Sequence, residues 1–196
     1  MSSKIIGITG GVGSGKSTVL DYLKNKYKAH IIMADDIGHE ALEPGTKTHE
    51  MIVEHFGQKI TDDNKTISHK KLADIIFNND KERNYINTII HPYALDRIKA
   101  ELKKYNDSDK MTVIETALMF ETTCDRLCDE VWGVITDDEI RIDRLINTRN
   151  YSREKAIALI ASQLSNAELI NKCDRIITNN DSYEELKENI DSLILL

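Results

Sequence analysis

The residues with the clearest chemical potential lie near the amino terminus, between Gly10 and Ser17, in the stretch GGVGSGKS. This stretch matches G-x-x-x-x-G-K-[ST], a pattern whose glycines let successive backbone N–H groups turn toward a bound anion. In such a loop Lys16 is expected to reach the β- and γ-phosphates of a nucleotide, while the hydroxyl of Ser17 coordinates the accompanying Mg²⁺. An apolar run precedes the loop and a helical pattern follows it, which is the context that the motif requires. The sequence therefore predicts a nucleotide-binding loop, in preference to a glycine-rich turn without a ligand.

Short apolar runs that alternate with helical patterns must position this loop. Strands are predicted at residues 4–9, 29–34, 111–115, 130–136 and 174–178. Helices are predicted at 17–27, over most of 36–105, from about 138 onward and at the carboxyl end of the chain. Buried strands separated by helices imply a parallel sheet covered on both faces, with ligands at the carboxyl ends of the strands. We expect an α/β fold with a long helical insertion between the second and third strands.

Composition sets limits on the class of protein. The chain has 196 residues, a length typical of one domain, and 40% of them are hydrophobic. No apolar run approaches the roughly 20 residues of a membrane helix, and the first residues do not resemble a secretory signal. A net charge of −7 argues against nucleic acid as the main partner, and nothing indicates a membrane or an obligate protein partner. The three cysteines fit no common zinc spacing, so reduced thiols and a cytoplasmic location are expected.

An acidic residue follows the second predicted strand. Asp35 should lie on the same edge of the sheet as the phosphate loop, where its carboxylate could accept a proton from an acceptor hydroxyl in line with the γ-phosphate. The alternative is an N-cap for the next helix, a role that Asp36 could equally serve. We favour the catalytic role for Asp35.

Two short matches favour a different class, a GTP-binding switch. Residues 35–38 match D-x-x-G, and residues 171–174 match N-K-x-D. Asp35 comes only nineteen residues after Lys16, which leaves no room for a switch loop and two further strands. The N-K-x-D stretch precedes a predicted strand instead of following one. Chance matching is the favoured explanation for both.

Six segments spread over nearly the whole chain carry a specific resemblance. In order, they are TGGVGSGKST, ADDIGHEALEPG, the HP of IIHPYA, ETALMFE, RLINTRNYSREKAIALIASQ and ITNN. Together they resemble the dephospho-coenzyme A kinase family. The resemblance implies transfer of the γ-phosphate of ATP to the ribose 3′-hydroxyl of dephospho-coenzyme A (dephospho-CoA), the last step of coenzyme A synthesis. It also implies a P-loop kinase fold with a core (1–35, 107–137 and 171–196), an acceptor-binding helical insertion (about 36–106) and a lid (about 138–170).

The resemblance assigns roles residue by residue. Asp35 matches the catalytic aspartate. ATP-binding positions are Gly11, Gly13, Ser14, Gly15, Lys16, Ser17, Thr18, Arg149 and Asn179. Acceptor-binding positions are Thr9, Asp35, His91, Leu118, Phe120 and Glu121. Plain alternatives remain for some of them: His91-Pro92 as a helix break, Leu118 and Phe120 as core, and Asn179 as part of a simple turn.

Four arginines recur within thirteen residues of the lid segment: Arg141, Arg144, Arg149 and Arg153. A closing segment that places an arginine over a triphosphate can contribute on the order of 10³ to 10⁵ in rate. Arg144 and Arg149 are the preferred pair for this catalytic role. The alternative, a solvated helix face with ion pairs at i, i+4, suits Arg141 and is open for Arg144.

The chain also departs from the family pattern. Met33 stands where the family has an aspartate, Glu115 replaces another, and Asn150 follows the lid arginine where an aspartate is usual. These departures leave the set of magnesium ligands undecided. Ser17 is expected to be one ligand, and Asp35 or Glu115 is the candidate for another, directly or through water. Another small-metabolite or nucleoside monophosphate kinase is the main alternative function, and a GTP-binding switch the more distant one.

Overall fold

The computed structural model describes residues 4–77, 79–105 and 111–195, and the chain divides into two compact units. The first unit comprises residues 1–32 and 105–196, and the second comprises residues 33–104. Each unit is described by itself below.

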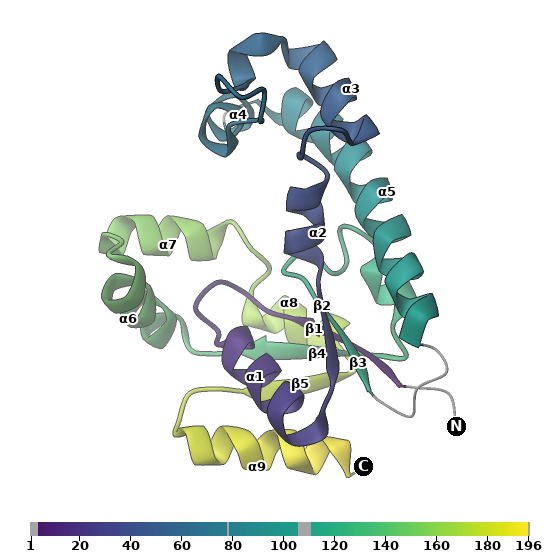
Figure 1. Cartoon of the computed structure of the whole chain (residues 1–196). Coiled ribbons are helices and arrows are strands. Elements are labelled where there is room, and N and C mark those ends of the chain that lie inside the picture. The colour runs from purple at the N-terminus through teal and green to yellow at the C-terminus, as the bar shows by residue number, and fades with distance from the viewer. Residues whose placement is uncertain (1–3, 78, 106–110, 196) are drawn as a thin grey trace. The chain divides into compact units, whose positions relative to one another are not determined.

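A five-stranded sheet organises the first unit (Figure 1). Its order is β2-β3-β1-β4-β5, with β1 in the centre. The neighbours β1 and β3, β1 and β4, and β4 and β5 all pair in parallel. The strands are β1 (Ile5–Thr9), β2 (His30–Met33), β3 (Thr112–Glu115), β4 (Glu130–Ile135) and β5 (Arg175–Thr178). The predicted parallel α/β fold is therefore confirmed, and all five predicted strands are present.

Helices cover the sheet because its central strands are apolar on both sides. The helices of this unit are α1 (Lys16–Tyr27), α6 (Asp138–Arg149), α7 (Arg153–Ala161), α8 (Asn166–Lys172) and α9 (Tyr183–Ile194), with a short 3₁₀ helix η2 (Cys124–Leu127). Helices α1 and α9 lie side by side on one face, and α8 packs against β4 on the other (Figure 1). Trp132 of β4, fully buried, is among the largest core side chains.

Two strand glycines let thiols approach the sheet closely. A Cβ added at Gly7 of β1 would lie 2.9 Å from the Sγ of Cys128, and one at Gly133 of β4 would lie 2.9 Å from the Sγ of Cys173. Burial raises the pKa of the Cys128 thiol to about 12 and that of Cys173 to about 11. All three cysteines are free thiols, as expected. They are packing elements of the core.

The second unit is helical and has its own core. Its elements are α2 (Ala34–Glu40), α3 (Lys47–Phe56), the 3₁₀ helix η1 (Gln58–Ile60), α4 (His69–Ile76) and most of α5 (Asp80–Tyr105). Thr46 caps α3 by accepting a hydrogen bond from the N–H of His49. The buried apolar cluster consists of Leu42, Ile52, Phe56, Ile60, Ile67, Leu72, Ile86 and Ile89. Arg97 of α5 pairs with Glu40 of α2 at 3.2 Å, which ties the first helix of the unit to the last.

Helix α5 passes through Pro92 without ending. A proline inside a helix removes one backbone donor and costs about 3 kcal/mol. Burial of Ile86, Ile89 and Ile98 along the same helix offsets this cost. The alternative in which His91-Pro92 breaks a helix is therefore wrong.

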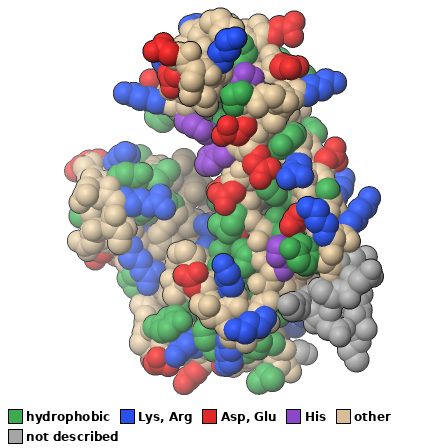
Figure 2. All heavy atoms as spheres, in the orientation of Figure 1, with side chains coloured by type: hydrophobic (Ala, Val, Ile, Leu, Met, Phe, Trp, Pro, Cys, Tyr) green, Lys and Arg blue, Asp and Glu red, His purple; other side chains and the backbone are tan. Residues whose placement is uncertain are grey.

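The surface is mixed in charge. On the face shown in Figure 2, basic and acidic side chains are interspersed over both units. Within the described residues, no helix combines the length and apolar character that crossing a membrane requires.

Candidate active site

The phosphate loop leaves the end of β1 and runs into the first turn of α1. Its backbone needs glycine at two crowded positions. Gly10 has a φ of 151°, and a Cβ there would lie 2.4 Å from the carbonyl oxygen of Val134. Gly15 has a φ of 91°, and a Cβ there would lie 2.0 Å from the Nδ2 of Asn179. Neighbouring backbone and side chains therefore press on the outer side of the loop.

Every carbonyl from residue 10 to residue 14 accepts a hydrogen bond. The Nζ of Lys16 donates to Gly10 O at 2.9 Å, and the N–H of Ser14 donates to Gly11 O at 3.2 Å. The Nε of Arg141 donates to Val12 O at 2.9 Å. The first three carbonyls are therefore held by a lysine, a turn and an arginine.

The carbonyl of Gly13 is held from α6, and that of Ser14 is held by residues that follow β4 and β5. The Nη1 of Arg144 lies 3.3 Å from Gly13 O, and the Nδ2 of Asn179 lies 2.8 Å from Ser14 O. The Oγ1 of Thr136 is a second donor to Ser14 O, at 3.0 Å. In a trans peptide the C=O and the following N–H point in opposite directions, and the described residues contain no cis peptide. A loop carbonyl held by a donor therefore turns the following N–H away from that donor. Of the loop N–H groups, that of Val12 donates to Gln163 and that of Ser14 donates to Gly11 O, whereas those of Gly11, Gly13 and Gly15 have no partner among the described residues and are available to an anion-binding nest.

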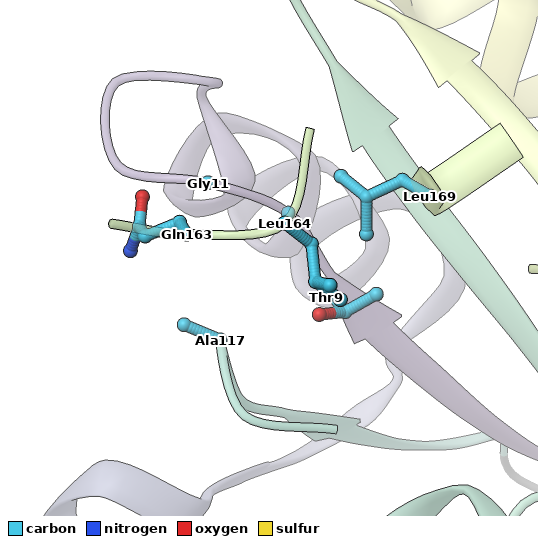
Figure 3. A pocket seen from close by; sticks show the side chains of 7 residues that line it. Thr9, Gly11, Ala117, Gln163, Leu164 and Leu169 are labelled. Carbon is cyan, nitrogen blue, oxygen red and sulfur yellow. The ribbon is translucent and has the colours of Figure 1, made fainter. Parts of the chain in front are cut away.

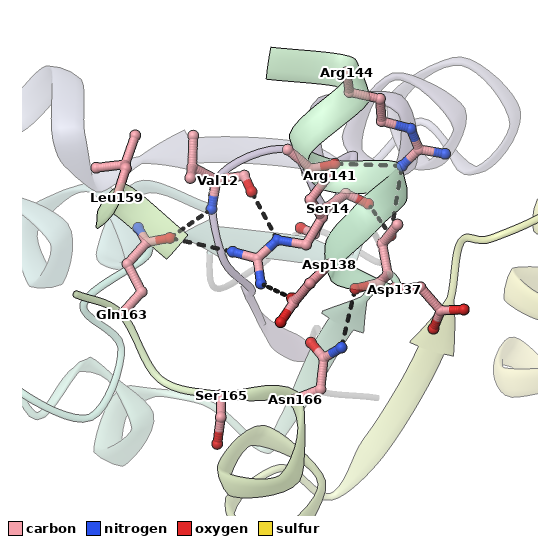
Figure 4. A network of polar contacts seen from close by, with 12 residues as sticks. Val12, Ser14, Asp137, Asp138, Arg141, Arg144, Leu159, Gln163, Ser165 and Asn166 are labelled. Atoms are coloured by element: carbon pink, nitrogen blue, oxygen red, sulfur yellow. Dashed lines mark hydrogen bonds and ion pairs between the residues drawn. The ribbon is translucent and has the colours of Figure 1, made fainter. Parts of the chain in front are cut away.

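Arg141 is the most deeply buried charge at the loop, with 2% of its surface exposed (Figure 4). Its Nη1 pairs with Asp138 at 3.0 Å, and its Nη2 lies 3.4 Å from the Oε1 of Gln163. The same Oε1 accepts the N–H of Val12 at 2.8 Å. Burial lowers the pKa of the Arg141 guanidinium, and Asp138 opposes this effect. The expectation of a solvated ion pair at Arg141 is corrected, because the guanidinium points to the loop although it keeps an acidic partner on its own helix.

Sequence reasoning missed Gln163 and gave Arg141 the wrong surroundings. One signal was present in the doubled glycine at the start of the loop. A Cβ at Gly11 would lie 2.1 Å from the Nη2 of Arg141, so the second glycine makes room for the guanidinium. The motif itself leaves position 11 open, and a glycine at an open position indicates a close approach by another group.

Lys16 has an acidic partner as well as its loop carbonyl. Its Nζ lies 3.5 Å from an oxygen of Glu115, whose side chain is 6% exposed at the end of β3. Ser17, in the first turn of α1, is exposed. Thr18 follows, and its N–H donates to Gly15 O at 3.0 Å. A cation, a carboxylate and a hydroxyl are thus available at the carboxyl ends of adjacent strands.

Two hydroxyls beside the loop are buried without a hydrogen-bond partner among the described residues. They are the Oγ1 of Thr9 and the Oγ of Ser14. Thr9 lines a small pocket together with Gly10, Gly11, Ala117, Gln163, Leu164 and Leu169 (Figure 3). A buried polar atom without a partner is costly, so a ligand or an ordered water is expected to supply the missing bond.

The segment after β3 carries three of the predicted acceptor-binding residues. Leu118 is 46% exposed, whereas its neighbour Met119 is fully buried. The core alternative is therefore wrong for Leu118, and Met119 fills the core instead. Phe120 is half-buried under the Nζ of Lys172, which lies 5.1 Å from the ring centroid, and Glu121 is exposed.

Asp35 and His91 belong to the second unit, whereas the phosphate loop belongs to the first. Helix α2 begins at Ala34 with Met33 as its N-cap, so the capping alternative is wrong for both Asp35 and Asp36. Both carboxylates are exposed in the first turn of α2, where the helix dipole favours negative charge. His91 is half-buried within α5.

The lid arginines differ in their surroundings. Arg144 lies against the loop, and its Nη2 also donates to Asn179 O at 3.0 Å. Asn179 is more than part of a simple turn, because its side chain is buried and donates a hydrogen bond to the loop carbonyl of Ser14. Arg149 is the exposed last residue of α6, and within the described chain its side chain makes no hydrogen bond or ion pair. Its role over a nucleotide stays a prediction.

The N-K-x-D match lies at the other edge of the sheet. The carboxylate of Asp174 accepts the N–H of Val131 at 2.7 Å, which joins the start of β5 to the start of β4. Since β4 and β5 are parallel to β1, these starts lie opposite the edge where the phosphate loop leaves β1. The match therefore takes no part in a site at the loop.

Comparison with known proteins agrees with this geometry. The sequence profile of a family described as dephospho-CoA kinase matches residues 4–185. A dephospho-CoA kinase of Fusobacterium nucleatum is 41% identical over 192 residues, covering 97% of each chain. One from Vibrio parahaemolyticus is 35% identical over 189 residues, covering 96% of this chain and 92% of the relative.

Solved structures support the same assignment. The dephospho-CoA kinase from Campylobacter jejuni is similar with a TM-score of 0.65 at 25% identity, covering 98% of this chain and 96% of the other. A Thermus thermophilus protein has a TM-score of 0.85 at 22% identity, covering 100% and 98%. A shikimate kinase from Acinetobacter baumannii has a TM-score of 0.55 at 18% identity, covering 98% and 93%. The last two show the P-loop kinase fold alone. With a family profile and close relatives that span nearly its whole length, the chain belongs to the dephospho-CoA kinase family.

Proposed function

We propose that this chain transfers the γ-phosphate of ATP to the ribose 3′-hydroxyl of dephospho-CoA, giving coenzyme A and ADP. The observation that carries the proposal is the loop backbone, whose carbonyls from residue 10 to residue 14 all accept hydrogen bonds. With these carbonyls held, the N–H groups of Gly11, Gly13 and Gly15 would be available to bind a phosphate chain. Family membership supplies the acceptor. Another small-metabolite kinase is the alternative, and the cytoplasm stays the predicted location.

Phosphoryl transfer needs cations around the γ-phosphate, because they stabilise the negative charge of the transition state. Lys16 supplies one from the start of α1, and Arg144, held beside Gly13, supplies a second. Arg149 would supply a third from residues 138–170, the proposed lid. Closure of this lid would exclude water and so limit hydrolysis of ATP. A phosphoryl transfer depends mainly on such positioning and charge, because little covalent chemistry falls to the protein.

The residues proposed for the acceptor are those that the family resemblance assigns. Asp35, with an exposed carboxylate in the first turn of α2, is the proposed general base for the 3′-hydroxyl. His91 and the exposed positions Leu118 and Glu121 are proposed to contact dephospho-CoA, together with Phe120. Thr9 would use its buried hydroxyl, which lacks a protein partner among the described residues, on the acceptor or the phosphate.

The donors beside the loop fit a magnesium ion. The hydroxyl of Ser17 and the buried carboxylate of Glu115 are oxygen ligands of the kind that Mg²⁺ prefers, and Asp35 is a further candidate. The described residues contain no cluster of three His, Cys, Asp or Glu side chains that could hold a metal, so triphosphate and water oxygens would complete the shell. When bound, the ion would neutralise charge on the β- and γ-phosphates.

A coupled assay for ADP tests the proposal. Purified protein is given ATP and Mg²⁺ with or without dephospho-CoA, and GTP is run in parallel. We expect ADP release that requires the acceptor, together with formation of coenzyme A. Slow hydrolysis that prefers GTP and ignores the acceptor would contradict the proposal. Acceptor-dependent ADP release with a different metabolite would favour the alternative kinase.

Replacement of the proposed base separates chemistry from binding. Asp35→Asn should keep ATP affinity while kcat falls by roughly 10² to 10⁴, the usual contribution of a general base. Asp36→Asn is the matched control, because both carboxylates are exposed in the first turn of α2. Initial rates at saturating ATP and dephospho-CoA measure the effect. Equal losses in both variants would sink the assignment of Asp35.

A further inference from the structure

Val12 is the single apolar side chain between Gly10 and Gly15, and residues 138–163 hold it in three ways. We propose that Arg141 and Gln163 are positioning residues that fix Val12 and thereby set the phosphate-binding shape of the loop. This inference rests on the proposed use of the loop for ATP. Neither residue is proposed to touch the nucleotide.

The backbone of Val12 is bonded on both of its polar atoms. Its N–H donates to the Oε1 of Gln163 at 2.8 Å, and its carbonyl accepts from the Nε of Arg141 at 2.9 Å. The Nη2 of Arg141 lies 3.4 Å from the same Oε1, which closes the set of contacts (Figure 4). Val12 is thus held by Arg141 of α6 and by Gln163, which follows α7.

The side chain of Val12 adds a third attachment. It packs against a buried cluster formed by Ile142, Leu145 and Ala156 of α6 and α7. The cluster and the two hydrogen-bond donors and acceptors all belong to residues 138–163. Val12 is the apolar anchor of the loop, and it adds to the hydrogen bonds that hold the neighbouring carbonyls of Gly13 and Ser14.

The two hydrogen bonds to Val12 have a direct consequence for phosphate binding. Because Arg141 holds the carbonyl of Val12, the N–H of Gly13 points away from Arg141. The N–H of Val12 itself donates to Gln163 and is therefore not part of the anion-binding nest. Arg141 and Gln163 therefore orient two of the loop amides, those of Gly13 and Val12.

The connection that carries Gln163 is attached at both ends: the N–H of Gln163 donates to Ile160 O at 3.2 Å, and Asn166 bonds to the segment after β4. Gln163 lies in the connection between α7 and α8, and the Nδ2 of Asn166 in the first turn of α8 donates to Thr136 O at 2.9 Å. Thr136 follows β4 directly. The backbone that carries Gln163 is thus fixed on either side of it, as a positioning role requires.

Two substitutions of Gln163 test the proposal. Gln163→Leu keeps the approximate size but removes the acceptor, whereas Gln163→Glu keeps an acceptor oxygen for Val12 and Arg141. Without nucleotide, hydrogen exchange at the Val12 amide should accelerate at least about tenfold in Gln163→Leu and stay slow in Gln163→Glu. Binding of ATP and of ADP, measured by calorimetry with Mg²⁺, should weaken about five- to tenfold in Gln163→Leu, the scale of one lost hydrogen bond.

A control variant comes from the same segment. Arg153→Met removes an exposed ion pair with Glu139 and should leave both exchange and nucleotide affinity at wild-type values. Unchanged ATP and ADP affinity in Gln163→Leu, with or without a lower melting temperature, would overturn the proposal and leave Gln163 a purely structural residue. Weakened binding together with unchanged Val12 exchange would also overturn it, because the effect would then bypass the loop.

Arg141 provides a second test through a double-mutant cycle. Arg141→Lys keeps a charge but cannot reach Val12, Asp138 and Gln163 together, so nucleotide binding should weaken. Combined with Gln163→Leu, the losses should be less than additive, because both residues act on Val12. Additive losses would count against the proposal. Binding and exchange need no dephospho-CoA, so a wild-type protein that binds ATP but does not phosphorylate dephospho-CoA overturns only the proposed function.

Discussion

The phosphate loop and the junction between α1 and α9 are two polar assemblies of the same unit, and they treat their polar atoms differently. At the junction, Asp191 accepts hydrogen bonds from Tyr22 at 2.8 Å, Tyr27 at 2.7 Å and Lys26 at 2.5 Å. At the loop, the hydroxyls of Thr9 and Ser14 are buried with no partner among the described residues. Both regions join segments far apart in the sequence, but only the junction is satisfied by the protein alone.

The difference separates stability from function. Hydrogen bonds from Lys26 and Tyr27 lower the pKa of Asp191 to about 2, which shows that its charged form is preferred in the folded state. The loop instead keeps costly unpaired groups, because a ligand is to complete them. Changes at the loop should therefore damage activity more than stability, and changes at the junction should do the reverse.

The largest effect is expected at Lys16. Lys16→Ala removes the cation beside Gly10 and Glu115, so kcat/KM should fall by about 10² to 10³, with the free energy of unfolding changed by at most about 2 kcal/mol. Lys24→Ala, an exposed position of the same helix, is the control. Steady-state rates and chemical denaturation measure the two quantities. Loss of folding in step with activity would erase the contrast between the regions.

Two glycines with similar backbone angles sharpen the comparison. Gly15 has a φ of 91° and is crowded by Asn179, whereas Gly45 has a φ of 93° and would place a Cβ in open space. Alanine at either position carries a left-handed strain of about 1 to 2 kcal/mol. Gly15→Ala must also displace Asn179 from Ser14, so ATP affinity should fall about tenfold or more in calorimetry. Gly45→Ala should bind ATP normally, and equal effects would show that strain alone governs the loop.

The smallest effect is expected at the junction. Asp191→Asn should lower the free energy of unfolding at pH 7 by about 1 to 2 kcal/mol, since hydrogen bonds to the two tyrosines weaken, and should leave kcat unchanged. Denaturant titration and the ADP assay measure both. A catalytic defect as large as that of Lys16→Ala would contradict the division of roles.

The same junction has a defined pH dependence. The folded pKa of Asp191, about 2, lies below its unfolded value near 3.9. Its contribution is therefore complete above about pH 4 and is lost as the pH falls through about 2. The difference in unfolding free energy between wild type and Asp191→Asn should shrink over this interval. A constant difference from pH 7 to pH 2 would show that the carboxylate charge plays no part.

Much of the fold was predictable from local pattern. Buried parallel strands are short apolar runs, so the prediction at 130–136 corresponds to β4 at Glu130–Ile135. The phosphate loop was predictable because its glycines, Lys16 and Ser17 are adjacent in sequence. The strand predicted at 29–34 ends one residue early, at Met33, because α2 begins at Ala34. Element boundaries depend on such local competition more than on periodicity.

The surroundings of single side chains were less predictable. Arg141 lies in a charged helical pattern that suits a solvated face, yet it bonds to Val12, 129 positions away. Gln163 reaches the same residue across 151 positions. Contacts between residues so far apart in the sequence depend on where the sheet places its loops. A local sequence pattern carries no information about that placement. Arg144 could be expected at the loop only through a family resemblance.

The thiols packed against the central strands have a consequence for redox chemistry. Burial raises the pKa of Cys128 to about 12 and that of Cys173 to about 11, so both are protonated thiols at pH 7. Exchange with a disulfide requires the thiolate, and Cys124 is buried with a raised pKa as well. Dephospho-CoA and coenzyme A both carry a thiol that forms disulfides on oxidation. The sulfur atoms of Cys128 and Cys173, packed against Gly7 and Gly133 and held as thiols, should therefore react slowly with a disulfide of either compound.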